Sequence, residues 1–315
     1  MDLCQLLNKM ISKQKIGINP KPPKREFLIT VLIKAAGYSA IIFVGMIFLF
    51  LLLESIPALR EVELSNLLSS RWYPIEDHYG VLPLIGGTLI ITFGATMIAL
   101  PFGVGTAIYL SEIAPRWLRE TLKPLVEILG GLPSVVLGFL GMLILSPYLR
   151  LWLDLPTGLT ALAGSILLGG IAIPTVVSIS EDALDAVPKS YRDASLAMGA
   201  TEWQTIWRVT LPAARSGVLT AVMLGIGRAI GETMTVMMVT GNAPILPTGL
   251  KDLFSPVRTM TATIAAEMGE VANSSTHYHV LFLIGIILFL ISLVVNVTAS
   301  AVVFRQKKSQ ERILS

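Results

Sequence analysis

Six blocks of this chain are almost free of charge, and each is long enough to cross a membrane as a helix. The blocks cover residues 35–53, 81–111, 124–149, 155–180, 216–242 and 280–304, and a break is expected in the third block at Gly130-Gly131-Leu132-Pro133. A helix needs about 20 apolar residues to cross a bilayer core, and only helices or closed barrels satisfy all backbone hydrogen bonds in lipid. The chain is 53% hydrophobic and 14% charged, whereas about a quarter of the residues of soluble domains are charged. We therefore predict an all-α polytopic membrane protein with six transmembrane helices.

The distribution of lysine and arginine predicts the orientation of these helices, because positive residues accumulate in cytoplasmic segments. With both termini in the cytoplasm, eighteen of these residues fall on cytoplasmic segments, five fall on outer loops and Arg228 lies in the membrane. The expected parts of the chain are cytoplasmic tails over 1–34 and 305–315, a first transmembrane helix over 35–53, and a core domain over 81–304 that contains a cytoplasmic loop over 181–212. No small-residue cleavage site follows the first block, so we expect no cleaved signal. The outer loops over 54–80 and 243–279 are long enough to receive an external partner.

The loop over 181–212 carries signals for two short helices that meet at a glycine. Pro188 suits the start of the first helix, because its missing N–H needs no partner there. Gly199 suits a left-handed cap at the end of that helix. Thr201 and Gln204 fit a capping box that starts the second helix. These signals predict a compact elbow.

The second helix of the elbow is expected to be amphipathic and to stop before Pro212. Its helical period places four residues on one face, namely Trp203, Ile206, Trp207 and Thr210. One interpretation is a hairpin that lies on the inner leaflet of the membrane, which the two tryptophans favour. The other interpretation is a docking surface for a cytoplasmic partner.

An ordered string of residues in this loop resembles the EAA loop of bacterial ABC importers. The family pattern is Glu-Ala-Ala, three residues, Gly, nine residues and Ile-x-Leu-Pro, and here it reads Asp193-Ala194-Ser195, Gly199, Val209 and Leu211-Pro212. The replacements of Glu by Asp, Ala by Ser and Ile by Val are mild. In that family the loop forms the coupling helix that docks on the ATPase subunit. The resemblance therefore implies that these residues couple the chain to an ATPase.

Three further segments, 107–112, 132–136 and 227–234, look like those of phosphate-importer permeases. The continuation over 239–242 is similar to the PstC type of permease subunit rather than to its sister subunit PstA. As a set, these motifs are specific. The resemblance implies a MetI-like fold and a place in the bacterial inner membrane. It also implies a heterodimer with a PstA-like permease subunit, a PstB-like ATPase dimer and a periplasmic PstS-like phosphate-binding protein.

By the same resemblance, the chain would form half of the translocation pathway of an ATP-driven importer of inorganic phosphate. No Gly-x-x-x-x-Gly-Lys-Ser/Thr sequence occurs in the chain, so we expect ATP and Mg²⁺ to bind to the ATPase subunit. We expect no enzymatic activity and no cofactor in this chain. Import of another oxyanion, such as molybdate or phosphonate, is an alternative. An ATP-independent channel or secondary transporter is a further alternative from a different class.

Arg228 and Glu232 lie in the fifth block and, four residues apart, are predicted to share one face of a helix. An arginine at mid-membrane costs roughly 2.5–3.5 kcal/mol on insertion scales, so it should face protein or water. The hypothesis is that the planar guanidinium of Arg228 binds the transported anion. Glu232 would neutralise Arg228 when no anion is bound and would keep the affinity low enough for release. The alternative is a structural ion pair that joins helices.

The remaining residues with possible chemistry are assigned structural roles. The glycines Gly217, Gly225, Gly227 and Gly231 fall in two pairs with small-residue spacing and predict close approach of helices. Glu127 follows Lys123 by four residues, which favours an interfacial ion pair over a transport role. His78, His277 and His279 lack clustered carboxylates or thiols, so no metal site is expected. The single cysteine, Cys4, cannot form an internal disulfide.

Overall fold

The computed structural model describes the backbone of residues 24–314, and the chain divides into two compact units between Phe50 and Leu51. The first unit contains the beginning of helix α2 (Lys24–Glu61). Its apolar side chains from residue 28 onward are almost all exposed, as expected for a helix that faces lipid. Helix α2 begins before residue 35, so the part of the predicted tail over 24–34 is helical. The rest of that tail lies outside the described residues.

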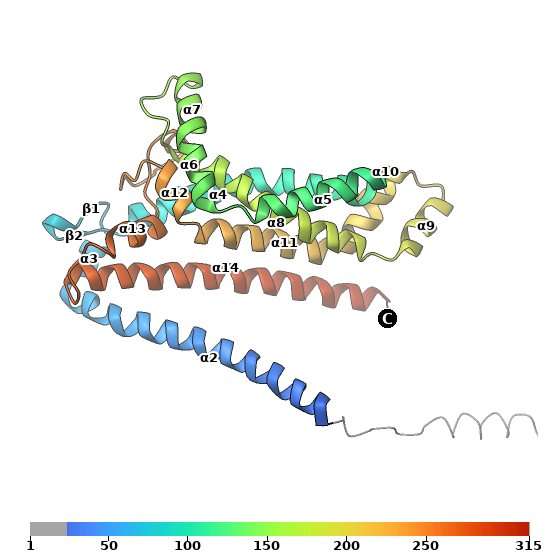
Figure 1. The fold of residues 1–315 in the computed structure, drawn as a ribbon, viewed down its shortest axis with the longest axis horizontal. Coiled ribbons are helices and arrows are strands. Elements are labelled where there is room, and N and C mark those ends of the chain that lie inside the picture. Colours follow the sequence, from blue (N-terminus) through green and yellow to red (C-terminus); the bar gives the residue numbers. More distant parts are fainter. Residues whose placement is uncertain (1–23, 315) are drawn as a thin grey trace, which may run out of the picture. The chain divides into compact units, whose positions relative to one another are not determined.

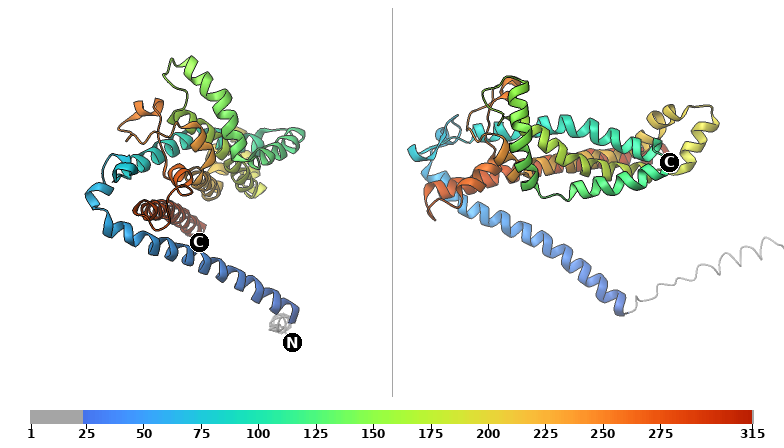
Figure 2. Two further views of the ribbon diagram at one scale, coloured as in Figure 1. Left: turned by 60° about the vertical axis from the view of Figure 1, so that its left-hand side comes forward. Right: turned by 45° about the horizontal axis from the view of Figure 1, so that its top comes forward.

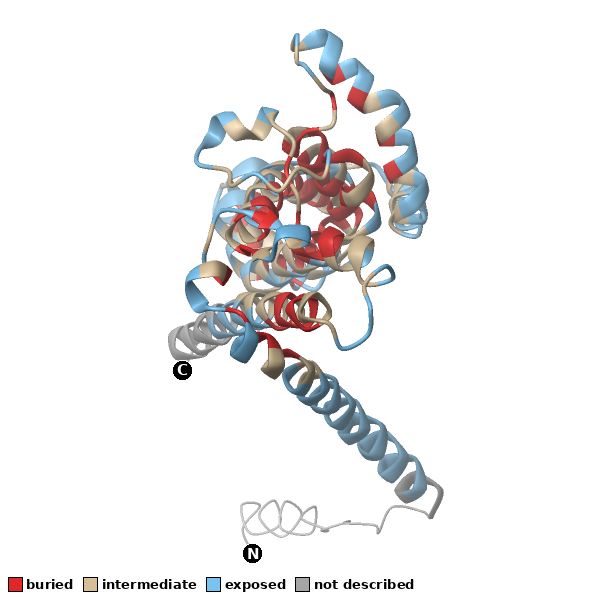
Figure 3. Cartoon of the chain, turned by 90° about the vertical axis from the view of Figure 1, so that its left-hand side faces the viewer, coloured by how far each residue is buried: buried red, intermediate tan, exposed pale blue. Residues whose placement is uncertain are grey.

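Four helices of the second unit run side by side and form its main bundle (Figure 1, Figure 2). They are α4 (Leu82–Ile108), α8 (Ala161–Asp185), α11 (Leu211–Gly231) and α14 (Thr276–Leu314). Helices α4 and α8 approach closely because small residues line their contact. A Cβ atom at Gly94 would come 2.3 Å from the hydroxyl oxygen of Ser165, and one at Gly103 would come 2.7 Å from the side chain of Val176. Buried residues are concentrated where these helices meet (Figure 3).

Six helices within the described residues are long and apolar enough to cross a membrane, which confirms the predicted number. They cover Leu28–Glu61, Leu82–Ile113, Ser134–Trp152, Ala161–Asp185, Glu202–Gly231 and Thr276–Thr298. The backbone of α14 stays helical to Leu314, so the predicted tail over 305–315 is helical as far as the structure describes it. The first helix is longer than predicted at both ends, and the third and fifth predicted spans are interrupted.

The third predicted span, 124–149, is interrupted at the expected break, and the membrane-crossing helix lies after this break rather than across it. Helix α5 (Arg116–Gly130) ends at the predicted break, and α6 (Ser134–Leu140) begins after it. A π-helical turn (Gly141–Leu145) and α7 (Ser146–Trp152) continue α6. Helix α5 lies along the bundle, whereas α6 and α7 run off at a steep angle to it (Figure 1). Pro133 explains the break, because it has no N–H and disfavours helical geometry in the residue before it.

The fifth predicted span, 216–242, is also interrupted. Helix α11 ends at Gly231, Glu232 has the extended angles φ −70° and ψ 128°, and α12 (Met234–Val239) follows. The carbonyl of Glu232 accepts a hydrogen bond from the Thr261 hydroxyl at 3.0 Å. This tertiary bond satisfies the carbonyl outside a helix. Arg228 and Glu232 therefore do not share one face of a continuous helix, which corrects the sequence prediction.

Short elements gather at the end of the second unit that was predicted to be outside the membrane. They are α3 (Leu64–Leu67), β1 (Trp72–Tyr73), a 3₁₀ turn η1 (Pro74–Glu76), β2 (His78–Tyr79), a second 3₁₀ turn η5 (Leu250–Phe254) and α13 (Met260–Glu267). Strands β1 and β2 pair antiparallel. Apart from this small hairpin and the isolated bridge between Gly241 and Val257, the described chain is built from helices and irregular turns.

Candidate functional site

Arg228 lies in the last turn of α11 and reaches two other helices. Its Nη1 donates a hydrogen bond to the hydroxyl oxygen of Thr175 on α8 at 2.9 Å. Its Nη2 donates to the carbonyl of Gly130, the last residue of α5, at 3.0 Å. The C-terminal end of a helix carries a partial negative charge. The guanidinium therefore lies at the C-terminal end of α5, and Arg228 itself lies in the last turn of α11, so both helix ends supply part of its counter-charge.

Glu232 makes different contacts from the predicted ones. Its carboxylate accepts a hydrogen bond from the backbone N–H of Thr235, in the first turn of α12, at 3.4 Å. Within the described residues, no ion pair joins Glu232 to Arg228. The prediction that Glu232 neutralises Arg228 is therefore wrong for this conformation, because the end of α11 turns the carboxylate toward α12.

Two interrupted helices meet close to Arg228. One break separates α5 from α6, and the other separates α11 from α12. The second halves of both helices are in contact, since the Thr235 hydroxyl donates to the Ser134 carbonyl at 2.9 Å. A Cβ atom at Gly138 would come 3.0 Å from the Cα of Thr235. Discontinuous helices at mid-membrane often form substrate sites in transporters, because their ends present uncompensated backbone groups.

The four glycines of α11 fall into two pairs with different surroundings. A Cβ atom at Gly217 or Gly225 would come within 2.3 Å or 2.7 Å, respectively, of a side chain on α8. These two glycines therefore allow the predicted close approach. A Cβ atom at Gly227 or Gly231 would meet no described atom within 4 Å. The predicted packing role of this second pair is not met within the described chain.

The elbow, defined here as residues 189–210, follows the predicted local signals. Helix α9 (Lys189–Ala197) begins after Pro188, and Gly199 adopts the left-handed angle φ +84°. Thr201 and Gln204 form both hydrogen bonds of the capping box that starts α10 (Glu202–Thr205). These three predictions are confirmed.

The second helix of the elbow does not stop before Pro212, which corrects the prediction. A π-helical turn (Ile206–Thr210) connects α10 directly to α11, and Pro212 lies in the first turn of α11. A proline inside a helix lacks a donor and crowds the preceding turn, and the wider π turn accommodates this. The elbow is therefore continuous with the helix that carries Arg228.

The motif residues of the elbow divide into buried and exposed groups. The hydroxyls of Ser195 and Thr205 are buried and lie 2.9 Å apart, which joins α9 to α10. Val209 and Leu211 are partly buried, whereas Asp193, Ala194, Gly199 and Pro212 are exposed.

The amphipathic face of the second elbow helix also divides. Trp203 and Trp207 pack edge to face, with ring centres 5.7 Å apart, and are 59% and 49% exposed. Ile206 and Thr210 are buried. The predicted common face of these four residues is therefore wrong. The aromatic pair and Met198, the residue that follows α9, are therefore exposed on the elbow.

Arg192 anchors the elbow to the bundle, and sequence reasoning missed this role. Its guanidinium donates to the carboxylate of Glu112 at 2.5 Å and 3.1 Å. It also donates to the carbonyls of Val187 at 2.7 Å and Leu184 at 2.9 Å. Glu112 lies in the π-helical turn (Tyr109–Ile113) that extends α4. One side chain thus joins α9 to the ends of α4 and α8.

A second charge cluster joins α5 to the last turns of α8. Glu181 is only 1% exposed, and its carboxylate accepts from Arg119 at 2.6 Å and from Lys123 at 2.5 Å. Lys123 also pairs with Asp182 at 2.9 Å, and Arg119 also pairs with Asp185. The hydrogen bond to Glu181 raises the pKa of Lys123, against the lowering effect of burial.

The predicted pair between Lys123 and Glu127 is wrong. Lys123 turns toward α8, where its partners Glu181 and Asp182 lie, while Glu127 is exposed. The acidic partners are more than fifty residues away in the sequence. The buried carboxylate of Glu181 requires a cationic partner, and Lys123 therefore pairs with it rather than with the exposed Glu127 four residues away.

Glu267, at the end of α13, joins three elements at the predicted outer end. Its carboxylate contacts Arg258 at 2.7 Å, His277 at 2.8 Å and the indole N–H of Trp72 at 3.2 Å. Burial raises the pKa of Glu267, but the bond with His277, the charge of Arg258 and the bond from Trp72 together outweigh it and lower this pKa. His279 hydrogen-bonds the carbonyl of Glu54 at 2.8 Å. These two histidines thus hold the outer elements together.

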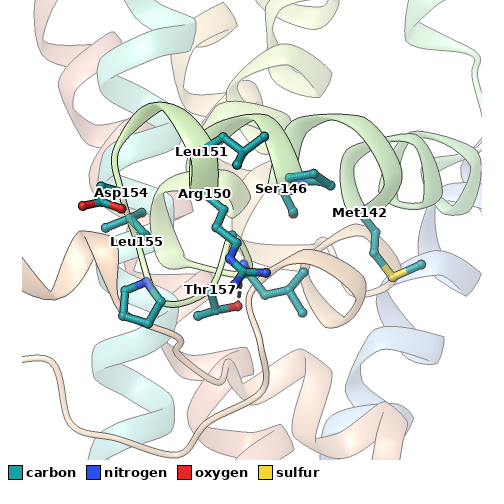
Figure 4. Close-up of a pocket in the computed structure, with 11 residues that line it drawn as sticks. Met142, Ser146, Arg150, Leu151, Asp154, Leu155 and Thr157 are labelled. Atoms are coloured by element: carbon teal, nitrogen blue, oxygen red, sulfur yellow. Dashed lines mark hydrogen bonds between the residues drawn. The ribbon is translucent and has the colours of Figure 1, made fainter.

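A further arginine, Arg150, lies in a pocket of about 700 Å³ beside α7 (Figure 4). The pocket is lined by residues between Met142 and Leu159. Inside it, the backbone N–H of Leu159 donates to the Thr157 hydroxyl at 3.2 Å. Arg150 is exposed, and Asp154 lines the same space. One positive and one negative side chain give this pocket no preference for anions.

The helix bundle, the interrupted helices at Arg228 and the anchored elbow together define a membrane transport permease. Residues 99–308 match the family described as binding-protein-dependent transport system inner membrane component. This match covers more than half of the chain, and the chain belongs to this family. The chain is therefore a permease subunit of the ABC importer type.

Comparison with individual proteins supports the same family. The chain is 42% identical over 228 residues to a probable ABC transporter permease protein, YqgH, of Bacillus subtilis, covering 72% of this chain and 73% of that protein. It is 34% identical over 291 residues to the phosphate transport system permease protein PstC of Mesorhizobium japonicum, covering 86% and 88%. An inward-facing structure of the methionine ABC transporter MetNI matches with a TM-score of 0.57 and 21% identity, covering 75% of this chain and 99% of that one. The predicted all-α, MetI-like fold is confirmed.

Proposed function

We propose that this chain is the PstC-type subunit of an ATP-driven importer of inorganic phosphate and forms half of its translocation pathway. The observation that carries the proposal is the position of Arg228 at the junction of two interrupted helices. The name of the Mesorhizobium relative supports phosphate as the substrate. The chain would lie in the bacterial inner membrane with both termini in the cytoplasm, as the lysine and arginine distribution favours.

The contacts of Arg228 support an anion site. Arginine keeps its charge at any physiological pH, yet both of its hydrogen-bond acceptors here, Thr175 and the Gly130 carbonyl, are neutral groups. The helix ends compensate the charge only in part. Arg228 is partly buried as a residue, and its planar guanidinium matches an oxyanion bidentately. A phosphate ion would complete the compensation.

The elbow supports a coupling role toward a PstB-like ATPase dimer. Asp193 and Ala194 of the motif, together with Met198, are exposed. The same segment is anchored to the bundle through Arg192 and through the buried hydroxyl pair of Ser195 and Thr205. A surface that is exposed outside and fixed inside can transmit a movement of the ATPase to the helices. An elbow that only rests on the inner leaflet would not need this anchoring.

The other proposed partners are a PstA-like permease subunit and a periplasmic PstS-like phosphate-binding protein. The membership in a binding-protein-dependent family supports the second of these. ATP and Mg²⁺ would bind to the ATPase subunits. Import of molybdate or phosphonate by the same architecture is the alternative substrate assignment, since a guanidinium binds each of these oxyanions.

The test is uptake of radiolabelled phosphate by the complete complex in proteoliposomes, with binding protein outside and ATP inside. Arg228→Gln should abolish uptake and leave complex assembly and basal ATP hydrolysis intact. Arg116→Gln is the matched control, because Arg116 is 92% exposed and far weaker effects are expected from surface charges. Loss of assembly in Arg228→Gln would instead support a structural role for Arg228.

Two further arms of this assay separate the alternatives. Unlabelled phosphate should compete with the label, whereas equal concentrations of molybdate, phosphonate and sulfate should not. Competition by one of these anions at lower concentration than phosphate would reassign the substrate. Uptake without ATP or without the binding protein would point to a channel or a secondary transporter.

A further inference from the structure

The two hydrogen-bond acceptors of Arg228 engage the terminal edge of the guanidinium, which is one of the two edges that can hold an oxyanion bidentately. They engage Nη1 and Nη2, the two terminal nitrogens. Bidentate recognition of a phosphate requires two neighbouring N–H groups of one guanidinium. An anion that approaches the terminal edge therefore meets Thr175 and the Gly130 carbonyl already in place.

The acceptors belong to helices that are themselves in contact. Gly130 closes α5, and a Cβ atom at this position would come 3.3 Å from the Cβ of Pro174, the residue before Thr175. Thr175 and the end of α5 thus lie side by side where they bind Arg228. The Gly130 carbonyl contributes part of the negative end of a helix dipole, equivalent to about half a charge. A phosphate ion carries at least a full charge and would displace such an acceptor.

We propose that the Thr175 hydroxyl and the Gly130 carbonyl are internal competitors of the transported oxyanion for Arg228. They take the role that the sequence suggested for Glu232, and they keep anion affinity low enough for release. The inference rests on the proposed function of Arg228. It makes Thr175 a positioning residue whose hydroxyl opposes anion binding.

The test measures anion binding to the purified complex of the permease pair and the ATPase, without binding protein. A ligand that binds only the folded state stabilises it by RT ln(1 + [L]/Kd), so the unfolding temperature rises with ligand concentration and rises sooner for a tighter site. Inorganic phosphate is titrated at constant ionic strength, and the concentration that produces a fixed rise in Tm is compared between variants. Thr175→Val removes the competing hydroxyl at nearly constant volume. Thr175→Ser keeps the hydroxyl and is the matched control.

In Thr175→Val, the loss of one competing hydrogen bond should lower the phosphate concentration that produces the fixed rise in Tm by about threefold to tenfold. Thr175→Ser should behave like the unmodified complex. Thr175→Ala removes the same oxygen and serves as a second variant if the valine variant does not assemble. If the variants without the hydroxyl need the same phosphate concentration for the fixed rise in Tm, the proposal is overturned. A higher concentration would also overturn it, because Thr175 would then be a ligand of the anion.

Arg228→Gln separates failure of this inference from failure of the proposed function. The phosphate-dependent rise in Tm should disappear in Arg228→Gln. If it disappears while Thr175→Val matches the unmodified complex, only the competition is refuted. If it persists in Arg228→Gln, the phosphate does not bind to Arg228, and the proposed site itself is wrong.

Discussion

Replacement of Arg192 by leucine should release the elbow from the bundle. The guanidinium of Arg192 makes four hydrogen bonds, two of them to Glu112 and two to backbone carbonyls at the end of α8. The Arg192 side chain is 20% exposed and the Glu112 side chain 7%. Removal of one partner of a buried ion pair costs about 3–5 kcal/mol, because the other charge is left buried and unpaired. Arg192 retains some access to solvent, so we take the lower limit of about 3 kcal/mol.

This loss should appear as local opening of α9, because the other contacts of the bundle are unchanged. Hydrogen exchange of backbone amides reports such local opening. A change of about 3 kcal/mol corresponds to roughly 150-fold faster exchange, since 1.36 kcal/mol is tenfold at room temperature. The measurement is hydrogen–deuterium exchange with mass spectrometry on the complete complex. The amides of α9 should accelerate, and those in the centre of α8 should not.

The matched control is Arg116→Leu. Arg116 pairs with Glu120 at 2.8 Å, but the two side chains are 92% and 65% exposed. An exposed pair of this kind contributes about 0–1 kcal/mol, so exchange should change by less than tenfold anywhere in the chain. The reasoning is refuted if Arg192→Leu leaves α9 exchange within about threefold of the original rate, a difference of less than 1 kcal/mol. Equal acceleration in α8 would show a general loss of stability instead.

Two further predictions concern packing and pH. Gly225→Ala should lower the Tm of the complex, because the new Cβ would lie 2.7 Å from the side chain of Val176. Gly227→Ala should leave the Tm unchanged or raise it, because its Cβ would meet no described atom within 4 Å and alanine favours a helix. Equal changes in Tm in the two variants would contradict the packing assignment. Because the folded-state pKa of Glu267 is lowered from its ordinary value of 4.5, its contribution to stability should be complete above pH 4.5 and be lost as pH falls through the lower folded value. Tm measured against pH should show this loss in the unmodified complex and a smaller acid dependence in Glu267→Gln, and identical profiles would refute it.

Features set by neighbouring residues were predictable from the sequence. The break after Gly130 follows from two glycines and a proline, and the capping box of Thr201 and Gln204 follows from two residues three positions apart. The left-handed angle of Gly199 follows from the absence of a Cβ atom. Each of these depends on the backbone chemistry of a few consecutive residues, so no knowledge of the fold was needed.

Features set by contacts between distant segments were not predictable in the same way. The sequence indicated that the positive charge of Arg228 must be compensated. It gave no reason to choose Thr175 or the Gly130 carbonyl, which lie 53 and 98 residues away. Glu232 was the nearest carboxylate in the sequence, and the end of α11 at Gly231 turned it aside. The pairing of Arg192 with Glu112 spans 80 residues. A single sequence contains no signal that joins such positions.

Helix α5 connects the two regions that these distant contacts create. Its last residue, Gly130, binds Arg228, and its first half is held by the bonds of Arg119 and Lys123 to Glu181. The 15 residues of α5 extend over about 22 Å at 1.5 Å per residue. None of them is fully buried, so its two charged attachments contribute strongly to its position. Displacement of the Gly130 carbonyl by an anion would free one end of a stiff helix whose other end remains fixed beside the elbow. Occupancy of Arg228 and the position of the elbow would therefore be linked through a single element.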